Sequence, residues 1–459
     1  MFPFIRTPRT LRVSVATVLY AGLLTTAAMA ANPKLQTIDI TPTAKTISVG
    51  QVQSFTATGT FSNGSKQVLG RAISNIAAGG DNTCALLTSR GVECWGFNQE
   101  GQLGGGNNTQ RSVVPVGVIG ISTATAVDVG TGSSCALLAS GVVKCWGGNG
   151  FGELGNGSNT ISNIPVSVTG ISTATALATE VFHSCAVLAG GSVQCWGEGD
   201  DGQLGNGSKT GSNIPVNVIG ISTATALGLG FDYSCALLAS GAVQCWGLGF
   251  DTPVTVSGIN NATAIAAGDD FRCALLASGA VQCWGRNWAG QLGNGSNSDS
   301  NIPVSVTGIS TAIAITAGSG HACATLRSGS VKCWGHNSYG QLGNGMTTNS
   351  NIPVFVNGIN SPTRLAAGAE HTCALFLGGL MKCWGYNYSG QLGLGWWDLK
   401  THPLAVIVAG TPGVLWTSSD SSKATITDRG IATGRAVGNT TISATTSGLI
   451  NDNAVLTVK

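Results

Sequence analysis

One segment constrains this chain more than any other, because it recurs seven times. Its first copy begins at Cys84 and reads CALLTSRGVECWG, with two cysteines ten positions apart and the second followed at once by Trp-Gly. The first cysteines of successive copies are 51, 50, 50, 38, 50 and 50 residues apart. A fixed period of this size indicates a propeller or a solenoid.

Each repeat contains four short β-prone runs separated by turns. Between residues 308 and 356 these runs read TAIAITAG, CATL, VKCWG and IPVFV. The fourth run carries a proline once per repeat, at Pro115, Pro165, Pro215, Pro253, Pro303, Pro353 and Pro403. Proline cannot donate to a strand ladder, so it belongs on an edge strand or at a strand start. Four strands and an edge proline describe a propeller blade, and the predicted class is all-β with seven blades.

The first thirty residues have the features of a secretory signal peptide. Three arginines precede an uncharged apolar run from 13 to 24, and Ala28-Met29-Ala30 offers a cleavage site. The competing interpretation is a buried N-terminal helix. No later segment is long and apolar enough to span a bilayer. We therefore expect an exported protein, either periplasmic, on the cell surface or extracellular, with no transmembrane segment in the mature chain.

Export favours disulfides for the fourteen cysteines, which number two per repeat. Zinc is the competing interpretation, but C-x9-C is not a usual zinc spacing and no histidine follows each pair at ligand distance. The two cysteines lie symmetrically about a turn, so they face each other across a hairpin within disulfide range. The Trp that follows points to the other sheet face, between blades. The predicted pairs are Cys84–Cys94, Cys135–Cys145, Cys185–Cys195, Cys235–Cys245, Cys273–Cys283, Cys323–Cys333 and Cys373–Cys383.

The stretch GHACATLRSGSVKCWGHNSYGQLGNG resembles the repeat of the regulator of chromosome condensation family, including its alpha-tubulin suppressor-like bacterial members. Gly-x-Leu-Gly follows Trp-Gly in six copies, marked by Gln102, Glu153, Gln203, Gln291, Gln341 and Gln391. The resemblance covers about residues 72–408 and implies a seven-bladed propeller. The cysteine pair departs from the family's cytosolic members. The fourth copy also departs, because about twelve residues are absent after Trp246, which predicts a short outer loop and a notch in the rim.

The two ends of the chain read as separate antiparallel β segments, residues 35–69 and 414–458. Neither has enough strands to close a core alone, whereas together they approach an immunoglobulin-like sandwich. They also resemble, in order, the two halves of a bacterial Ig-like group 2 domain. We therefore expect a propeller inserted into one Ig-like β-sandwich, with two separate partial domains as the alternative. The expected boundaries are 1–30 signal peptide, 31–71 first half, 72–408 propeller and 409–459 second half.

Charge and motifs argue against catalysis and against nucleic acid. Beyond the signal peptide, 19 Lys and Arg face 20 Asp and Glu, which is not the balance of a nucleic-acid-binding protein. His183, His321 and His371 occupy one repeat position that elsewhere holds Asn, Ser, Tyr or Phe, so a structural role is favoured over catalysis. No catalytic motif appears. We predict no catalytic residue, no cofactor and no metal site, and calcium at Asp200-Asp201 or Asp269-Asp270 stays an open question.

The loops after Trp-Gly vary most and carry aromatic side chains, as binding loops on a rigid scaffold often do. Equivalent loops of consecutive blades lie side by side, so their aromatics should form one arc. The candidate binding residues are Trp288, Tyr339, Tyr386, Tyr388, Trp396 and Trp397. The alternative is that several of them only cover the rim.

The predicted function is that of an exported, non-enzymatic monomer whose propeller loops bind a protein or a surface ligand, in adhesion or at the cell envelope. The resemblance does not bring with it the nucleotide exchange or chromatin binding of the cytosolic founder, because the chain reads as exported and lacks a basic arm. A secreted beta-lactamase inhibitory protein uses a similar propeller, so inhibition of a secreted or periplasmic enzyme such as a beta-lactamase is the alternative.

Overall fold

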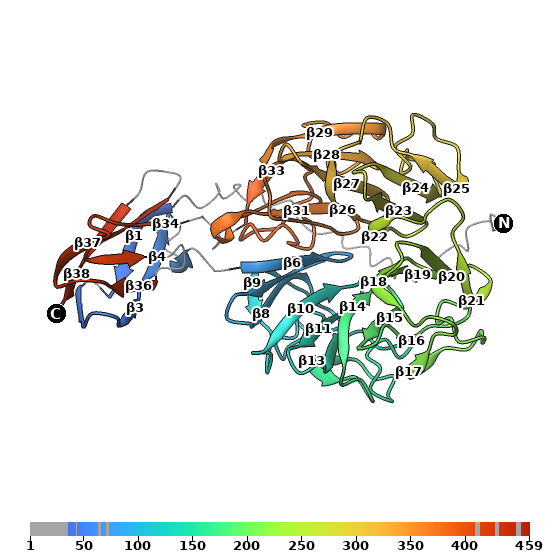
Figure 1. The fold of residues 1–459 in the computed structure, drawn as a ribbon, viewed down its shortest axis with the longest axis horizontal. Coiled ribbons are helices and arrows are strands. Elements are labelled where there is room, and N and C mark those ends of the chain that lie inside the picture. Colours follow the sequence, from blue (N-terminus) through green and yellow to red (C-terminus); the bar gives the residue numbers. More distant parts are fainter. Residues whose placement is uncertain are drawn as a thin grey trace, which may run out of the picture.

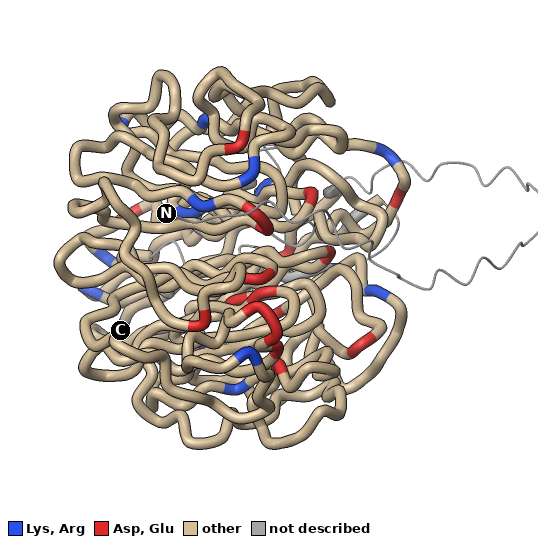
Figure 2. The backbone as a smooth tube through the Cα atoms, turned by 90° about the vertical axis from the view of Figure 1, so that its right-hand side faces the viewer, with Lys and Arg blue, Asp and Glu red and all other residues tan. Residues whose placement is uncertain are grey.

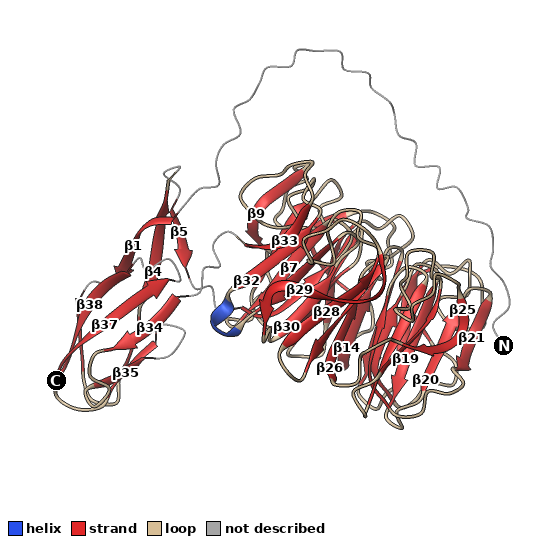
Figure 3. Cartoon of the chain, turned by 90° about the horizontal axis from the view of Figure 1, so that it is seen from above, coloured by secondary structure: helices blue, strands red, loops and turns tan. Residues whose placement is uncertain are grey.

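A computed structural model describes residues 35–42, 44–62, 66–69, 73–408, 414–426, 431–446 and 451–459. Figures 1 and 3 show that the described chain is built almost entirely of strands, with one short 3-10 helix, η1 (Leu377–Gly379). The predicted signal peptide lies outside these residues. The all-β class is confirmed.

Residues 73–408 form seven four-stranded antiparallel sheets, one for each sequence repeat. We number these blades 1 to 7 in chain order. The first strands are β6 (Ile73–Ala78), β10 (Ala124–Val129), β14 (Ala174–Thr179), β18 (Ala224–Leu229), β22 (Ala262–Ala267), β26 (Ala312–Ala317) and β30 (Arg364–Ala367). The second strands are β7 (Asn82–Leu87), β11 (Ser133–Leu138), β15 (His183–Leu188), β19 (Tyr233–Leu238), β23 (Phe271–Leu276), β27 (His321–Leu326) and β31 (His371–Leu375).

The outer half of each blade contains the third and fourth strands. The third strands are β8 (Val92–Phe97), β12 (Val143–Gly147), β16 (Val193–Gly197), β20 (Val243–Gly247), β24 (Val281–Gly285), β28 (Ser330–Gly335) and β32 (Met381–Gly385). The fourth are β9 (Arg111–Gly117), β13 (Ser162–Ser167), β17 (Ser212–Asn217), β21 (Phe250–Thr255), β25 (Ser300–Ser305), β29 (Ser350–Asn360) and β33 (His402–Ile407). Each repeat proline lies in this fourth strand, which pairs on one side only, as the sequence predicted.

The blades close into a ring. Each first strand contacts the first strand of the next blade, and β30 of blade 7 contacts β6 of blade 1. The first strands surround a central cavity of about 310 Å³. This arrangement confirms the predicted seven-bladed propeller.

The cysteine pair and the tryptophan of each repeat lie on opposite faces of the blade. Cys84 and Cys94 face each other in the register of β7 and β8, and all seven cysteine pairs of the repeats are disulfide-bonded with Cα atoms 4.0–4.1 Å apart. Trp146 of blade 2 is fully buried in the same hydrophobic cluster as Cys84 and Cys94. The same contact recurs at all seven junctions, so each blade covers its neighbour's disulfide with an indole ring.

The sandwich combines strands from both ends of the chain, as the blue and red strands of Figure 1 show. Its first sheet contains β1 (Leu35–Thr41), β4 (Thr56–Phe61) and β5 (Lys66–Leu69). A second sheet contains β2 (Ala44–Ile47), β38 (Asn451–Val458), β37 (Gly438–Thr446) and β34 (Val414–Ser418). A third contains β3 (Val52–Ser54), β36 (Ile431–Gly434) and β35 (Ala424–Ile426).

One hydrophobic core unites the two halves of the sandwich. It packs Ile40 and Phe55 of the first half with Trp416 and Leu456 of the second. The predicted Ig-like sandwich with an inserted propeller is therefore confirmed. The expectation of purely antiparallel strands was wrong at one place, since β2 and β38 pair in parallel. These two strands come from opposite ends of the chain, so no hairpin turn fixes their direction.

Removing one disulfide should destabilise the ring measurably. Closing an 11-residue loop contributes about 2.8 kcal/mol in the chain-entropy model, so a Cys185→Ala, Cys195→Ala variant should lose at least about that much unfolding free energy in urea. Non-reducing peptide mapping of the unmodified protein is the control. Links between blades, or no loss of stability in the variant, would contradict the pairing within each blade.

Candidate functional site: the loop face of the propeller

Antiparallel blades divide the connections of the propeller between two faces. Loops from first to second strand and from third to fourth strand share one face, which we call the loop face. It contains residues 79–81, 130–132, 180–182, 230–232, 268–270, 318–320 and 368–370, and residues 98–110, 148–161, 198–211, 248–249, 286–299, 336–349 and 386–401. The remaining connections form the opposite, turn face. It contains residues 88–91, 139–142, 189–192, 239–242, 277–280, 327–329 and 376–380, and residues 118–123, 168–173, 218–223, 256–261, 306–311 and 361–363.

The long outer loops of the loop face are held by the polar residues of the repeat motif. In blade 6, Asn337 Oδ1 accepts the backbone N–H of Leu342, and its Nδ2 donates to the carbonyls of Met346 and Thr348. Gln341 Oε1 accepts the N–H of Tyr339, and Leu342 is fully buried beneath the loop. The bond between Asn and the Leu N–H recurs in blades 1, 2, 5 and 7, so the motif gives these loops a fixed shape from which variable side chains project.

The predicted aromatic arc is present on the loop face. It runs through Trp288 of blade 5, His336 and Tyr339 of blade 6, and Tyr386 and Tyr388 of blade 7, and ends at Trp397. Successive ring centroids lie 5.3, 6.4, 4.4, 6.1 and 5.7 Å apart. Trp288 is 61% exposed and Trp397 49%, so the two ends of the arc are open to solvent.

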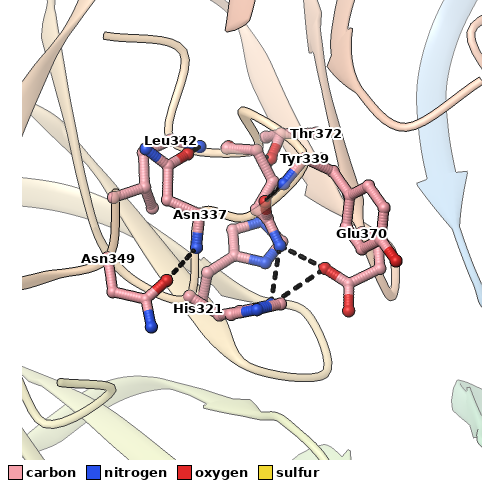
Figure 4. A network of polar contacts seen from close by, with 9 residues as sticks. His321, Asn337, Tyr339, Leu342, Asn349, Glu370 and Thr372 are labelled. Carbon is pink, nitrogen blue, oxygen red and sulfur yellow. Dashed lines mark hydrogen bonds and ion pairs between the residues drawn. The ribbon is translucent and has the colours of Figure 1, made fainter. Parts of the chain in front are cut away.

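A polar network fixes the middle of this arc (Figure 4). His336 Nδ1 lies 3.1 Å from Glu370 Oε2, and Gln341 Nε2 donates to the same carboxylate oxygen. Gln341 Nε2 also lies 3.0 Å from His336 Nδ1. The His336 ring is thereby held between Trp288 and Tyr339, and the arc is a preorganised surface rather than a set of independent side chains.

Arg111 completes the arc at the junction with blade 1. Its guanidinium carbon lies 4.9 Å from the ring centroid of Tyr388 and 4.4 Å from that of Trp397. The guanidinium also donates to the Tyr388 carbonyl oxygen. A cation over an aromatic face within about 6 Å is attracted by the ring quadrupole. The arc therefore already holds one cation of its own chain.

The residues of this surface differ from the predicted binding residues in three places. Trp396 is half-buried against the hydrophobic cluster between blades 7 and 1, and no ring contact joins it to the arc. His336 and Arg111 were missed. Aligning the repeats could have found His336, because it occupies the same loop position as Tyr386.

A second aromatic cluster, which was not predicted from the sequence, lies on the other side of the ring. Phe182 of blade 3 lies 4.9 Å from Phe151 of blade 2 and 5.2 Å from Phe231 of blade 4, measured between ring centroids. Two of these rings come from the short loops between first and second strands, whereas the prediction considered only the loops after Trp-Gly.

The three repeat histidines join blades rather than line a site. The Nε2 atoms of His183, His321 and His371 lie 2.8 Å from hydroxyl oxygens of the next blade, those of Ser234, Thr372 and Thr83. Each hydroxyl donates its own proton to a loop carbonyl, so the imidazole must donate through Nε2–H. Burial lowers the pKa of each histidine to about 3, which keeps the rings neutral.

The shortened loop of blade 4 changes the next junction. In six junctions the Trp indole N–H donates to the carbonyl of the Gln or Glu in the preceding loop, at 2.7–3.0 Å. Blade 4 has only residues 248–249 there, and Trp284 Nε1 finds no acceptor among the described residues. At this junction Arg272 replaces the usual Ser or Thr, and its guanidinium carbon lies 3.6 Å from the ring centroid of Tyr233.

Carboxylates concentrate around the mouth of the central cavity. Burial is the main cause that raises the pKa of Asp128 to about 7 and that of Asp269 to about 6. Burial also raises the pKa of Glu180 well above its usual range, and the neighbouring Asp269 and Asp128 raise it further. A nearby like charge disfavours ionisation, so it adds to the effect of burial on Glu180.

Comparison with known families identifies the repeat. Two models of the regulator of chromosome condensation (RCC1) repeat match the chain, one at residues 94–138, 190–237, 278–325 and 328–375. The other matches residues 73–102, 262–291, 312–341 and 363–391, so the matches together cover more than half of the chain. The chain belongs to the RCC1 repeat family. A model of the bacterial Ig-like domain (group 2) matches residues 404–458, which include the second half of the sandwich.

Solved structures of other proteins share this fold. Prp20p from Saccharomyces cerevisiae is 20% identical with a TM-score of 0.63, and the alignment covers 76% of this chain and 90% of that one. Human WBSCR16 is 22% identical with a TM-score of 0.62, covering 68% of this chain and 89% of that one. At these identities the likeness shows the fold alone. In the described part of the chain, no helix is long and apolar enough to cross a membrane.

The raised carboxyl pKa values predict how stability varies with pH. The pKa of an Asp in an unfolded chain is about 4, whereas burial raises the pKa of Asp128 to about 7 in the folded chain, so its ionisation costs stability as the pH rises between these values. Asn cannot ionise and can still accept the Thr179 N–H that Asp128 Oδ2 accepts at 2.8 Å. The melting temperature of an Asp128→Asn variant, relative to wild type, should therefore be higher at pH 8 than at pH 4.5. An equal difference at both pH values would contradict the raised pKa.

Proposed function

We propose that this chain is an exported, non-enzymatic scaffold that binds a protein or cell-surface ligand through the loop face of its propeller. The observation that supports this most is the aromatic arc. Trp288, Tyr388 and Trp397 are more than one third exposed, although large apolar side chains are normally withdrawn from water. Clustered Trp, Tyr and Arg side chains on a rigid surface are the residues that most often dominate protein interfaces.

The build of the propeller also favours binding over catalysis. The three repeat histidines are used within the framework, since His183, His321 and His371 are buried, neutral and bonded between blades. Related propellers serve binding: yeast RCC1 (Prp20) has been solved bound to Kap60, and binding to Gsp1p and histones is described for Prp20p. That likeness supports a protein partner as a class, without naming one.

Export is supported by the disulfides and by the Ig-like domain. Seven disulfides persist in an oxidising compartment, whereas cytosolic reductants keep thiols reduced. The bacterial Ig-like group 2 match agrees with a periplasmic, cell-surface or extracellular location. In this proposal the sandwich carries the propeller, and the loop face is turned to the partner.

The arc should be essential for binding the partner. Interface aromatics each cost roughly 2 kcal/mol or more when truncated, so a Trp288→Ala, Tyr386→Ala variant should keep its fold and lose most of its affinity for the partner. The partner is identified by pull-down from the cell envelope with mass spectrometry, and affinity is measured by surface plasmon resonance.

The matched control is Phe151→Ala, which removes an exposed aromatic ring from the other side of the loop face. Loss of binding in the control but not in the double variant would contradict this proposal, because the binding site would then lie near blade 2 and not along the arc of blades 5 to 7. A single stoichiometric enzyme as the partner would favour an inhibitor, whereas glycans or several surface proteins would favour adhesion.

A further inference from the structure

The two faces of the propeller differ sharply in charge. The short loops between first and second strands carry six Asp and Glu residues and no Lys or Arg: Asp81, Glu180, Asp232, Asp269, Asp270 and Glu370. The long outer loops add seven carboxylates against Lys209, Arg286 and Lys400. The connections of the turn face carry Arg90 and Arg327 and no carboxylate. Figure 2 shows many of the Asp and Glu positions gathered near the middle of the molecule.

The aromatic arc lies on the acidic face and touches its carboxylates. Glu370 contacts His336 within the arc. Asp81 accepts a hydrogen bond from Gln391 Nε2 at 2.8 Å. Burial raises the pKa of Tyr386, and the neighbouring Tyr339 and Asp81 raise it further. Aromatic faces and carboxylates therefore meet on one surface, and both attract cations.

The contacts of Arg111 show which chemistry this surface accommodates. Its guanidinium lies within 5 Å of the ring centroids of both Tyr388 and Trp397, at the edge of the same acidic face. Further along the arc, Trp288 is 61% exposed, and none of the described Lys and Arg residues forms a cation–π contact with its ring. The arc thus has room for a second guanidinium or ammonium group supplied from outside.

Resting on the proposed function, we infer that the partner of the loop face is a polypeptide whose contacting segment is rich in Arg and Lys. Its cationic side chains lie over the rings of the arc and close to the carboxylates around the cavity mouth. The charge of the face steers such a segment to the surface and repels acidic proteins and nucleic acids. Residues of the arc supply the short-range contacts that hold the segment in place.

The probe is a fluorescein-labelled (Arg-Ser-Gly)4 peptide, compared with its (Gln-Ser-Gly)4 and (Glu-Ser-Gly)4 counterparts by fluorescence anisotropy with the full chain at pH 7.5. The Arg peptide should bind at least tenfold more tightly than the Gln peptide in 20 mM NaCl. Its affinity should fall several-fold in 300 mM NaCl, because salt screens exposed charges. The Glu peptide should not bind.

Two double variants, each losing two carboxylates, distinguish an effect of charge on the loop face from an effect of the net charge of the protein. Asp270→Asn, Glu370→Gln removes two carboxylates from the short loops of blades 5 and 7, which also carry rings of the arc, and should weaken Arg-peptide binding at least threefold. Asp39→Asn, Glu93→Gln removes two carboxylates outside the loop face and should leave the affinity for the Arg peptide unchanged. Trp288→Ala, Tyr388→Ala should weaken binding at least tenfold if the rings contribute as inferred.

Equal binding of the Arg and Gln peptides, or equal affinity of the two charge variants, would overturn the inference. Competition by arginine amide at the peptide's own concentration would also overturn it, because the site would then recognise a small cation rather than a polypeptide. A different result would contradict the proposed function. It would be contradicted if the Trp288→Ala, Tyr386→Ala variant bound the cell-envelope partner as tightly as the wild type, independently of the peptide results.

Discussion

The ring depends on one contact, repeated seven times, between the indole of one blade and the disulfide of the blade before it. The disulfide staples the central hairpin of the blade, and the indole covers it and donates to the preceding loop in six of seven junctions. A single blade cannot bury its own faces, so stability comes from its neighbours. The same contact fixes the outer loop, because the carbonyl that accepts the indole N–H belongs to that loop.

This dependence explains why the loop face is a suitable binding surface. In blades 5 and 7, Asn, Gln and Leu of the motif hold the loop in a constant shape, which leaves positions such as Trp288 and Tyr388 free to vary. Preorganised side chains lose little conformational entropy on binding. Blade 4 gives the counter-example, since the shortened loop removes an acceptor and the indole N–H of Trp284 has none within the part of the chain that the structure describes.

Much of this could be predicted from the sequence, because it follows from repetition. The fixed spacing of the repeats predicted the blade, and the edge proline predicted the fourth strand. The symmetry of Cys84 and Cys94 about a turn predicted their pairing. The arc followed from the equivalence of loops in consecutive blades. Contacts set by three-dimensional proximity could not be read in this way: Arg111 meets Tyr388 only because the ring closes, and the parallel pairing of β2 with β38 depends on the two ends of the chain meeting.

The central claim is that a rigid ring presents its acidic, aromatic loop face to a partner. Hydrogen–deuterium exchange of the full chain, with and without bound Arg peptide, tests it most directly. The account predicts slow exchange in the inner strands of all seven blades, and added protection on binding only in loop-face segments such as 286–299, 336–349 and 386–401. Added protection in turn-face segments such as 88–91 and 327–329, or fast exchange in the inner strands, would contradict it.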